Sequence, residues 1–576
     1  MEDKVVSSGE YVMNQVLIQR YEWDTLNWRK LEKRVFKLQK RIYQASQNGN
    51  IKLVRKLQRL LTYSTSAKFL AVRKVTQDNR GKKTSGVDGK TVLKNEERKL
   101  LAENLNLKAE AMPIRRVWIP KAGKSEKRPL GIPTIKDRAK QALVKIGLEP
   151  EWEAKFEPNS YGFRVGRSCH DAIEAIYESV KRKKAYVLDA DISGCFDNIN
   201  HNTLLSKLNT SPRLRRVIKA WLKAGIIDNN VFHKNEKGTP QGGIISPLLA
   251  NIALHGMEND TKEALKQDLF EYMKAKKGKA SYMLSKRMLS IIRYADDFVI
   301  IHEDKAIMMK AKTFIEEWLK DMGLELKPSK TRICHTYSSI DGTKPGFDFL
   351  GFEIRQYKTN TNKQGYATII KPSKESLKRH LKVIRESLRN HRGETQDTVI
   401  RNLNPIIKGW SRYYINVASR KTFEKADHET FRKTWRWARF RHPHKGLKWT
   451  KDKYFKHHKN NDNWRFKSPK GSILVRHTDH KIKRTPKVKG TKSPFDGDFV
   501  YWSTRMGRYP ETSTRTASLL KYQQGKCKYC KLYFKTEDII ETHHINGDLK
   551  DNSTANLALL HGHCHDNIHR NKKVCM

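Results

Sequence analysis

The chain has 576 residues, well above the length at which one hydrophobic core usually divides into several domains. Its 116 Lys and Arg residues outnumber 61 Asp and Glu residues, and the net charge of +55 makes nucleic acid the expected partner. No apolar run approaches the roughly 20 residues that a membrane-spanning helix needs, and the first residues lack the basic and apolar regions of a signal peptide. We therefore expect no membrane partner and a location in a bacterial cytoplasm or an organellar matrix.

The N-terminal 60 residues are charged and predict an amphipathic helical extension. The apolar positions that repeat there at intervals of three or four residues are Leu31, Val35, Leu38 and Ile42. A Gly-containing loop, GKKTSGVDG, follows at residues 81–89. From there to about residue 356, short apolar strands alternate with helical stretches and Gly/Pro turns, which is typical of an α+β fold.

Acidic residues stand at the ends of apolar strands in two of these segments. YVLDADISGCFD, residues 186–197, is an apolar strand that leads into Asp191. IIRYADDFVII, residues 291–301, predicts a hairpin with Asp296 and Asp297 at its turn. Acidic pairs are common in solvated turns, but a hairpin of two apolar strands gains little from adjacent like charges. Phosphoryl transfer uses two Mg²⁺ ions about 4 Å apart, and carboxylates at rigid strand ends supply the oxygen ligands that Mg²⁺ prefers.

These two segments resemble the carboxylate motifs of reverse transcriptases, YADD and the strand that precedes it. The resemblance implies a right-hand polymerase with fingers, palm and helical thumb. It also implies Mg²⁺, dNTP substrates and three catalytic, metal-binding carboxylates: Asp191, Asp296 and Asp297. Phe196 lies five residues after Asp191, where the family has an aromatic gate against the ribose 2′-OH; a core phenylalanine is the other interpretation.

Five more segments resemble motifs of the same family in the same order. The fingers strands are resembled by RRVWIPK (115–121) and KRPLGIPT (127–134). The motif that holds template and nucleotide is resembled by GTPQGGIISPLLAN (238–251). The motifs near the primer are resembled by LKPSK (326–330) and FLGF (349–352). The nucleotide-binding residues that this implies are Arg115, Lys121, Arg128, Gln241, Gly242 and Lys330. Cationic side chains suit a triphosphate.

A helical pattern begins near residue 372, with Ser373 as its expected N-cap. The apolar stripe of this pattern is Leu377, Leu381, Ile384 and Leu388. Residues 431–490 then hold 20 Lys and Arg residues against 3 acidic residues, with tryptophans interleaved, which favours phosphate contacts and base stacking. The residues predicted to bind nucleic acid there are Arg436, Arg439, Arg441, Trp435 and Trp437. The stretch PKVKGTKSPFDGD, residues 486–498, predicts a flexible linker to a separate C-terminal module.

The C-terminal module is dense in Cys and His. Two spaced ligand pairs predict a tetrahedral structural Zn²⁺ site: Cys527, Cys530, His561 and Cys564. ETHHI, residues 541–545, and the histidines that follow resemble an HNH (ββα-metal) nuclease. By that resemblance His544 is the general base, Asn556 braces its loop, and one divalent cation is held by His543, His565 and His569. The alternative is that these histidines serve only zinc or the surface, although zinc needs only four ligands.

Taken together, the chain resembles a group II intron-encoded protein, in which reverse transcriptase, maturase and DNA endonuclease share one polypeptide. Residues 66–91 resemble its additional N-terminal motif, and residues 404–414 its thumb. The implied parts are a helical extension (1–60), fingers and palm (61–356), a thumb or maturase domain (371–430), a basic DNA-binding region with linker (431–510) and an HNH domain (511–576). The implied partners are the intron RNA and a DNA target. A splicing cofactor with decayed catalytic sites, a stand-alone reverse transcriptase and a merely basic, ribosomal-type surface are the competing interpretations.

Overall fold

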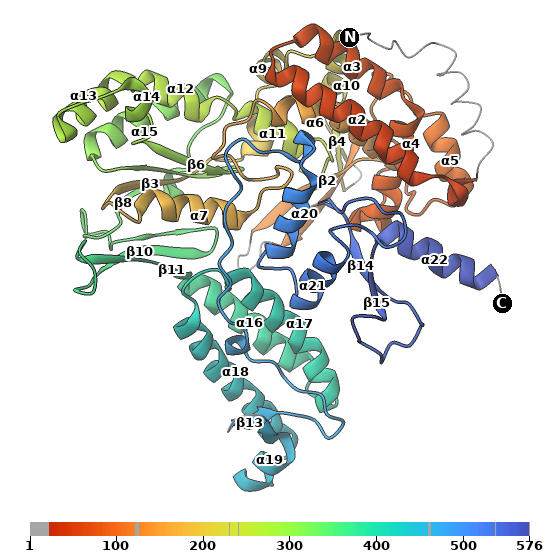
Figure 1. Cartoon of the computed structure of the whole chain (residues 1–576), viewed down its shortest axis with the longest axis vertical. Helices are drawn as coiled ribbons and strands as arrows, with labels where there is room; N and C mark the ends of the chain where they lie inside the picture. Colours follow the sequence, from red (N-terminus) through yellow and green to blue (C-terminus); the bar gives the residue numbers. More distant parts are fainter. Residues whose placement is uncertain are drawn as a thin grey trace.

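The computed structural model describes residues 22–120, 126–229, 231–239, 241–458, 462–535 and 537–574. Figure 1 shows a broad upper part, formed by the N-terminal helices, the fingers and the palm, from which the helices α16, α17 and α18 project downward. The C-terminal segment returns upward and lies beside the N-terminal helices. Among the residues described, no helix combines the length and the apolar character that crossing a bilayer requires.

The N-terminal part is helical, as predicted. Its elements are η1 (Trp23–Thr25), α2 (Trp28–Gln47), α3 (Ile51–Tyr63), α4 (Thr65–Arg73), η2 (Lys74–Asp78), η3 (Arg80–Lys83) and α5 (Asn95–Glu103). The predicted stripe is confirmed, because Leu31, Val35 and Ile42 are buried. Gly49, with φ of +68°, separates α2 from α3, so the chain turns between these two helices of the extension. Residues 1–21 of that extension lie outside the described residues.

The fingers carry a four-stranded sheet in the order β2-β1-β4-β5. Its strands are β1 (Ile114–Pro120), β2 (Lys127–Ile132), β4 (Ile226–Asp228) and β5 (Val231–His233). The helices between the N-terminal part and the end of the palm are α6 (Ile135–Glu153), α7 (Cys169–Val180), α8 (Cys195–Asn198), α9 (His201–Leu208), α10 (Pro212–Leu222), α11 (Ser246–Ala253), α12 (Met257–Ala264), α13 (Lys266–Lys277), α14 (Tyr282–Ser285), α15 (Lys305–Asp321) and η4 (Pro328–Lys330).

The palm is a second four-stranded sheet, in the order β6-β7-β3-β8. Its strands are β3 (Tyr186–Asp191), β6 (Ser290–Tyr294), β7 (Asp297–His302) and β8 (Arg332–His335). Side chains of β3 alternate between two cores: Leu188 belongs to the core that includes α15, and Val187 to the core that includes α7. Because both faces are covered, the interior positions of β6 and β7 are largely apolar, whereas the edge strand β8 carries the exposed Arg332.

The thumb begins after a three-stranded sheet of β9 (Phe347–Phe349), β10 (Phe352–Lys358) and β11 (Tyr366–Pro372). Its helices are α16 (Lys374–Asn390), α17 (Gln396–Tyr414) and α18 (Arg420–Arg441). Ser373 caps α16 as predicted, since its side chain accepts a hydrogen bond from the Ser376 amide. The position between residues 430 and 431, where a domain boundary was expected, lies inside α18. That helix continues because its buried stripe does: Phe423, Ala426, Thr430, Thr434 and Trp437.

Beyond the thumb, the chain turns through a small basic subdomain and then returns. The elements are α19 (Leu447–Tyr454), β12 (Phe455–His458), β13 (Asp462–Phe466), η5 (His477–Asp479), η6 (Pro494–Asp496) and α20 (Phe499–Arg508). The prediction of a flexible linker over 486–498 is wrong. Phe495 is buried, and the Val488 amide donates to Asp171 Oδ1 on α7 at 2.7 Å. Arg505 also forms an ion pair with Asp171, so the return segment is fixed to the palm.

The C-terminal module consists of α21 (Thr514–Tyr522), β14 (Ile540–His544), β15 (Leu557–His561) and α22 (Gly562–Val574). It packs against the N-terminal helices instead of standing apart. Lys74 Nζ lies 3.0 Å from Glu537 Oε2, and Lys535 Nζ lies 3.8 Å from Glu32 Oε2 on α2. His563 of α22 is buried and lies 3.9 Å from Asp78. The expectation of a separate module is therefore also wrong.

Candidate functional site

The three predicted carboxylates meet at one edge of the palm sheet. β3 and β7 are antiparallel, and their register pairs Asp191 with Asp297. Asp296 lies in the two-residue turn between β6 and β7, and its carbonyl oxygen accepts a hydrogen bond of 3.2 Å from the Ile192 amide. The strands therefore present Asp191, Asp296 and Asp297 together, as the sequence led us to expect.

At this edge of the sheet the negative charges are not fully balanced by nearby cations. Burial raises the pKa of Asp297 to about 7, and the charges of Asp296 and Asp191 add to the rise. Burial also raises the pKa of Asp296, which the charge of Lys330 partly opposes. Lys330, at the end of η4, is half-exposed and forms an ion pair with Asp191. Three carboxylates and one lysine leave a negative site with oxygen donors, which fits a pair of Mg²⁺ ions.

A cavity of about 590 Å³ lies between the fingers sheet and the α8 segment, within the size range of small-molecule sites. Its lining includes Phe196 and Gln241 from the predicted set, together with Asp197 and Arg116. The Phe196 ring is partly buried and meets the Phe163 ring edge-on, with centroids 6.0 Å apart. Gln241 Nε2 donates to Asp197 Oδ2 at 3.2 Å.

Two glycines allow the loop of residues 238–242 to lie against this cavity wall. Gly238 has φ of +85° and Gly242 has φ of +117°. A Cβ at Gly238 would overlap the backbone of Asp197, and one at Gly242 would overlap the carbonyl oxygen of Gly131. Any larger residue would push the loop away from α8 at Gly238 or from β2 at Gly242. The absence of a side chain at Gly242 thus allows the loop backbone to lie close to the backbone of β2.

The predicted triphosphate-binding cations divide into three cases. Arg128 is exposed on β2, and its charge opposes the raised pKa of Asp296, so it lies near the carboxylates. Arg115 instead donates from Nε and Nη2 to the Ser85 carbonyl oxygen at 3.1 and 2.7 Å, which ties it to the upstream loop. Lys121 lies outside the described residues.

Arg116 is the cation that the sequence interpretation missed. It lines the cavity with Phe196, and its charge opposes the burial-raised pKa of Asp197. Successive residues of a strand point to opposite faces, so Arg115 and Arg116 cannot both face the same site. Ile114 is buried and lines the same cavity, and the two-residue period from Ile114 would have selected Arg116.

The Cys and His residues predicted to bind zinc come together. The ligand atoms of Cys527, Cys530, His561 and Cys564 all lie within 4.8 Å of one another. His561 Nε2 lies 3.3 Å from Asp538 Oδ2, a carboxylate placed to orient the ring while Nδ1 faces Cys530. The donor set and the orienting carboxylate fit a structural Zn²⁺ ion.

A second histidine cluster lies between β14 and α22. The ligand atoms of His543, His565 and His569 are also within 4.8 Å of one another, and His565 Nδ1 lies 2.6 Å from Glu541. His544 follows His543 on β14 and therefore points to the other face of the hairpin. Asn556 accepts from the Asn546 amide at 2.9 Å and donates to the Asp551 carbonyl at 2.9 Å, so it braces the loop after His544.

The predicted nucleic-acid residues of α18 are only partly available. Arg436 is exposed, but Arg439 donates to the Lys445 carbonyl, and Arg441 donates to the Arg392 and Glu394 carbonyls. Trp437 is 4% exposed and donates from Nε1 to the His391 carbonyl, so it cannot stack on a base. Trp435 is partly buried against the core that contains Trp437.

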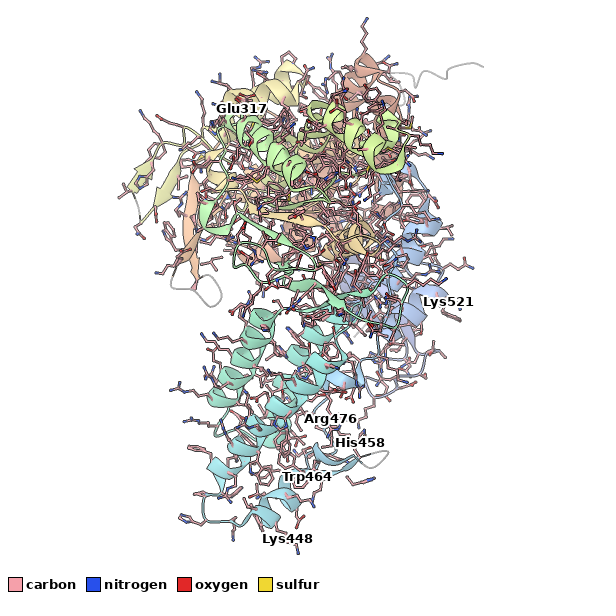
Figure 2. All side chains as sticks on the ribbon, turned by 90° about the vertical axis from the view of Figure 1, so that its left-hand side faces the viewer. Glu317, Lys448, His458, Trp464, Arg476 and Lys521 are labelled. Atoms are coloured by element: carbon pink, nitrogen blue, oxygen red, sulfur yellow. The ribbon has the colours of Figure 1, made fainter. Side chains whose placement is uncertain are left out.

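The exposed aromatic surface lies farther along the chain. Trp464 is 42% exposed, and Lys451 Nζ lies 4.8 Å from the centre of its ring. Figure 2 shows Trp464, Lys448 and His458 at the end of the thumb farthest from the palm. This end combines exposed aromatic and cationic side chains, which suits contact with a nucleic-acid strand.

Comparison with known proteins places these elements in a family context. Residues 119–354 match the sequence profile described as reverse transcriptase (RNA-dependent DNA polymerase), residues 23–105 the N-terminal domain of reverse transcriptase, and residues 377–455 the group II intron maturase-specific domain. The three matches cover the N-terminal helices, the fingers and palm, and the thumb.

Individual relatives agree with these profiles. Protein YkfC of Escherichia coli (strain K12) is 33% identical over 328 residues, which cover 52% of this chain and 83% of YkfC. Group II intron-encoded protein LtrA of Lactococcus lactis subsp. cremoris is 35% identical over 300 residues, or 44% of this chain. Maturase-like protein 1 of Euglena gracilis is 28% identical over 398 residues, 67% of this chain and 76% of that protein. The chain spans about half, 48%, of the length of LtrA.

Proposed function

Because this chain belongs to the family of group II intron-encoded reverse transcriptases with a maturase domain, we propose that it copies its intron RNA into DNA and assists the splicing of that RNA. The observation that carries the polymerase proposal is the meeting of Asp191, Asp296 and Asp297 at one sheet edge. A cavity of nucleotide size is lined by Phe196, which follows Asp191 by five residues. Steady-state primer extension on an RNA template by the full-length chain, with and without Mg²⁺, tests it directly.

In this proposal Asp191, Asp296 and Asp297 would hold two Mg²⁺ ions, which would supply positive charge to the attacking 3′-oxygen and the leaving pyrophosphate. Arg128 and Arg116 bring positive charge to the triphosphate from the fingers. Lys330 keeps a cation beside Asp191. Gly242 lets the nucleotide-side loop approach β2, and Gln241 fixes the loop to Asp197.

The sugar is selected by Phe196 in this proposal. Replacing Phe196 with valine should raise the efficiency of rNTP use relative to dNTP use by roughly tenfold or more. The reason is that a small change in the size of a pocket side chain changes the free-energy difference between two substrates by about 1–3 kcal/mol. Primer extension with each nucleotide type measures the ratio. Phe270→Val, on α13, is the matched control. An unchanged ratio would mean that Phe196 only fills the core that it packs against.

The maturase role rests on the thumb and on the positive charge of the chain. The maturase-specific match covers residues 377–455, which include most of α16 and all of α17 and α18. With a net charge of +55, the protein has the electrostatics of a polyanion-binding surface, and we propose intron RNA and target DNA as the partners. A purely structural splicing cofactor is disfavoured because the three polymerase carboxylates are all present.

The basic subdomain should contribute DNA affinity that does not depend on the base sequence. Arg436→Gln combined with Lys448→Gln removes two exposed cations, and each that meets a phosphate should flatten the salt slope by roughly 0.9 on duplex DNA. Target and non-target sequences should weaken by similar factors when affinity is measured against salt concentration.

Arg441→Gln is the contrasting control for this experiment. Its guanidinium binds backbone carbonyls, so the variant should lower the melting temperature without changing the salt slope. If the double variant lost affinity only for the target, with an unchanged slope, these cations would read bases and the proposal for this surface would be wrong.

We also propose that the C-terminal module is a DNA endonuclease of the HNH type that nicks the DNA target during intron mobility. The observation that favours this second activity is the His543, His565 and His569 cluster on a ββα arrangement, separate from the zinc ligand set. Here a divalent cation would neutralise the scissile phosphate. His544, braced through Asn556, would accept the proton of the attacking water.

A further inference from the structure

A buried arginine contacts the Ala295–Asp296 turn between β6 and β7. Arg293, near the end of β6, is 4% exposed. Its Nη1 donates to Asn251 Oδ1 at 3.1 Å and to the Ala295 carbonyl at 3.2 Å, and its Nη2 donates to Ser160 Oγ at 2.8 Å. Among the described residues Arg293 has no ion pair within 4.0 Å, and the carboxylates whose charges act on it are Glu157 and Glu258. Its partners are thus neutral oxygens on three different segments.

The turn that Arg293 contacts is intrinsically unfavourable. Ala295 has φ of +60°, a conformation that costs an L-residue roughly 1–2 kcal/mol. A two-residue hairpin loop with positive φ is usually built from Gly, Asn or Asp. Ala295 offers no side-chain hydrogen bond of its own, so the surroundings must hold the turn. The hydrogen bond from Arg293 to the Ala295 carbonyl helps to hold the turn in this conformation.

The segment 159–162 also stabilises this turn, through backbone hydrogen bonds and a close backbone approach. The Arg293 amide donates to the Asn159 carbonyl, and the Tyr161 amide donates to the Arg293 carbonyl, both at 2.9 Å. A Cβ at Gly162 would overlap the Ala295 amide, so only glycine fits there. Asn251, on α11, completes the network, because its Nδ2 donates to the Gly162 carbonyl at 2.9 Å.

We propose that Arg293, together with Asn251 and Ser160, is a positioning group that sets the geometry of the Ala295–Asp296 turn and thereby the affinity of the carboxylate site for its metal ions. This inference rests on the proposed polymerase function. Arg293 has five donors in a rigid fork, and two of its nitrogens reach three acceptors at once. A lysine would keep the charge but could not span the three acceptors.

The charge of Arg293 is balanced by carboxylates outside the turn. Burial lowers the pKa of Arg293, and the charge of Glu157 opposes that shift most, with a smaller contribution from that of Glu258. The lysine variant keeps this charge but loses hydrogen bonds, whereas the methionine variant removes both. Comparing the two variants therefore separates the hydrogen bonds from the charge.

The test compares Arg293→Lys, Arg293→Met and Ser160→Ala with the wild type, all in the full-length chain. Direct binding of Mn²⁺, measured by electron paramagnetic resonance on the complex with primer and template, reports the carboxylate site without turnover. Primer extension against Mg²⁺ concentration gives kcat, the KM for dNTP and the Mg²⁺ concentration for half-maximal rate. Arg332→Lys, a half-exposed arginine on β8 of the same sheet, is the matched control.

We expect Arg293→Lys to weaken Mn²⁺ binding and raise the Mg²⁺ requirement five- to tenfold, with kcat lower by tenfold or more and KM for dNTP within twofold. Arg293→Met should be more severe, Ser160→Ala should show a smaller shift of the same sign, and Arg332→Lys should behave as wild type. If Arg293→Lys does not fold, Ser160→Ala decides. Unchanged Mn²⁺ affinity and Mg²⁺ requirement, whatever happens to melting temperature or kcat, would overturn the proposal. A wild type without polymerase activity would contradict the proposed function, while Mn²⁺ binding would still decide the role of Arg293.

Discussion

Replacing Asp296 with asparagine should abolish cDNA synthesis by the full-length chain while leaving protein-assisted splicing of the intron RNA nearly intact. Asparagine keeps the shape of the side chain and the hydrogen bond from Ile192 to the backbone of residue 296, so the turn should persist. What is lost is one anionic metal ligand. Such charge stabilisation is worth several kcal/mol, and each 1.4 kcal/mol is about tenfold, so we expect a loss on the order of a thousandfold.

Splicing assistance should survive in this variant because it depends on RNA binding over the thumb and the basic surface rather than on metal ligation in the palm. Both activities are to be measured on one preparation. Asp341→Asn is the matched control, since Asp341 also occupies a turn with positive φ and its side chain is 81% exposed. Equal loss of both activities in Asp296→Asn would show that the two functions share the site and would contradict the division proposed here.

Replacing His544 with alanine should remove nicking of the DNA target while sparing polymerisation on an annealed primer. A general base contributes about 10²–10⁴-fold, and nicking should fall by that factor. His544 makes none of the contacts that fix the module to the N-terminal helices; these involve Lys535, Glu537 and His563. The polymerase should therefore keep its activity even though the module is packed against it.

Two controls make this result specific. Leu549→Ala lies in the same loop, and Leu549 is 76% exposed, so the variant should nick normally. The zinc content of His544→Ala should equal that of the wild type, because the four predicted zinc ligands are untouched. Normal nicking by His544→Ala would exclude it as the general base. Loss of polymerisation together with nicking would mean that the hairpin supports the fingers.

The carboxylate site was predictable from sequence because its determinants are local. Asp296 and Asp297 sit in a hairpin whose two apolar strands are adjacent in the chain, and Asp191 ends a strand of the same apolar character. Such patterns fix both the element and the edge at which the side chains emerge. The apolar stripe of α16 and its Ser373 cap were predictable for the same reason.

The errors arose where composition was used in place of periodicity. The linker prediction relied on Lys, Pro and Gly around residue 490, but Phe495 and Val488 in that stretch are buried. Trp437 was assigned to base stacking from its basic neighbours, although it continues the buried spacing of α18. Arg293 gave no sequence signal, because its role depends on Ser160 and Asn251, which only the fold brings to it.

The contact between the C-terminal module and the N-terminal helices also constrains the order of events during synthesis. The hydrogen bond from Lys74 to Glu537 joins residues 463 positions apart. At about 5–20 residues per second, a ribosome needs roughly 25 to 90 seconds to make the chain between them. Throughout that interval, Phe36 and the charged face around Lys74 on the nascent N-terminal helices are not yet covered by the C-terminal part of the chain. A binding partner that is present during translation could shield this face until the last segment arrives.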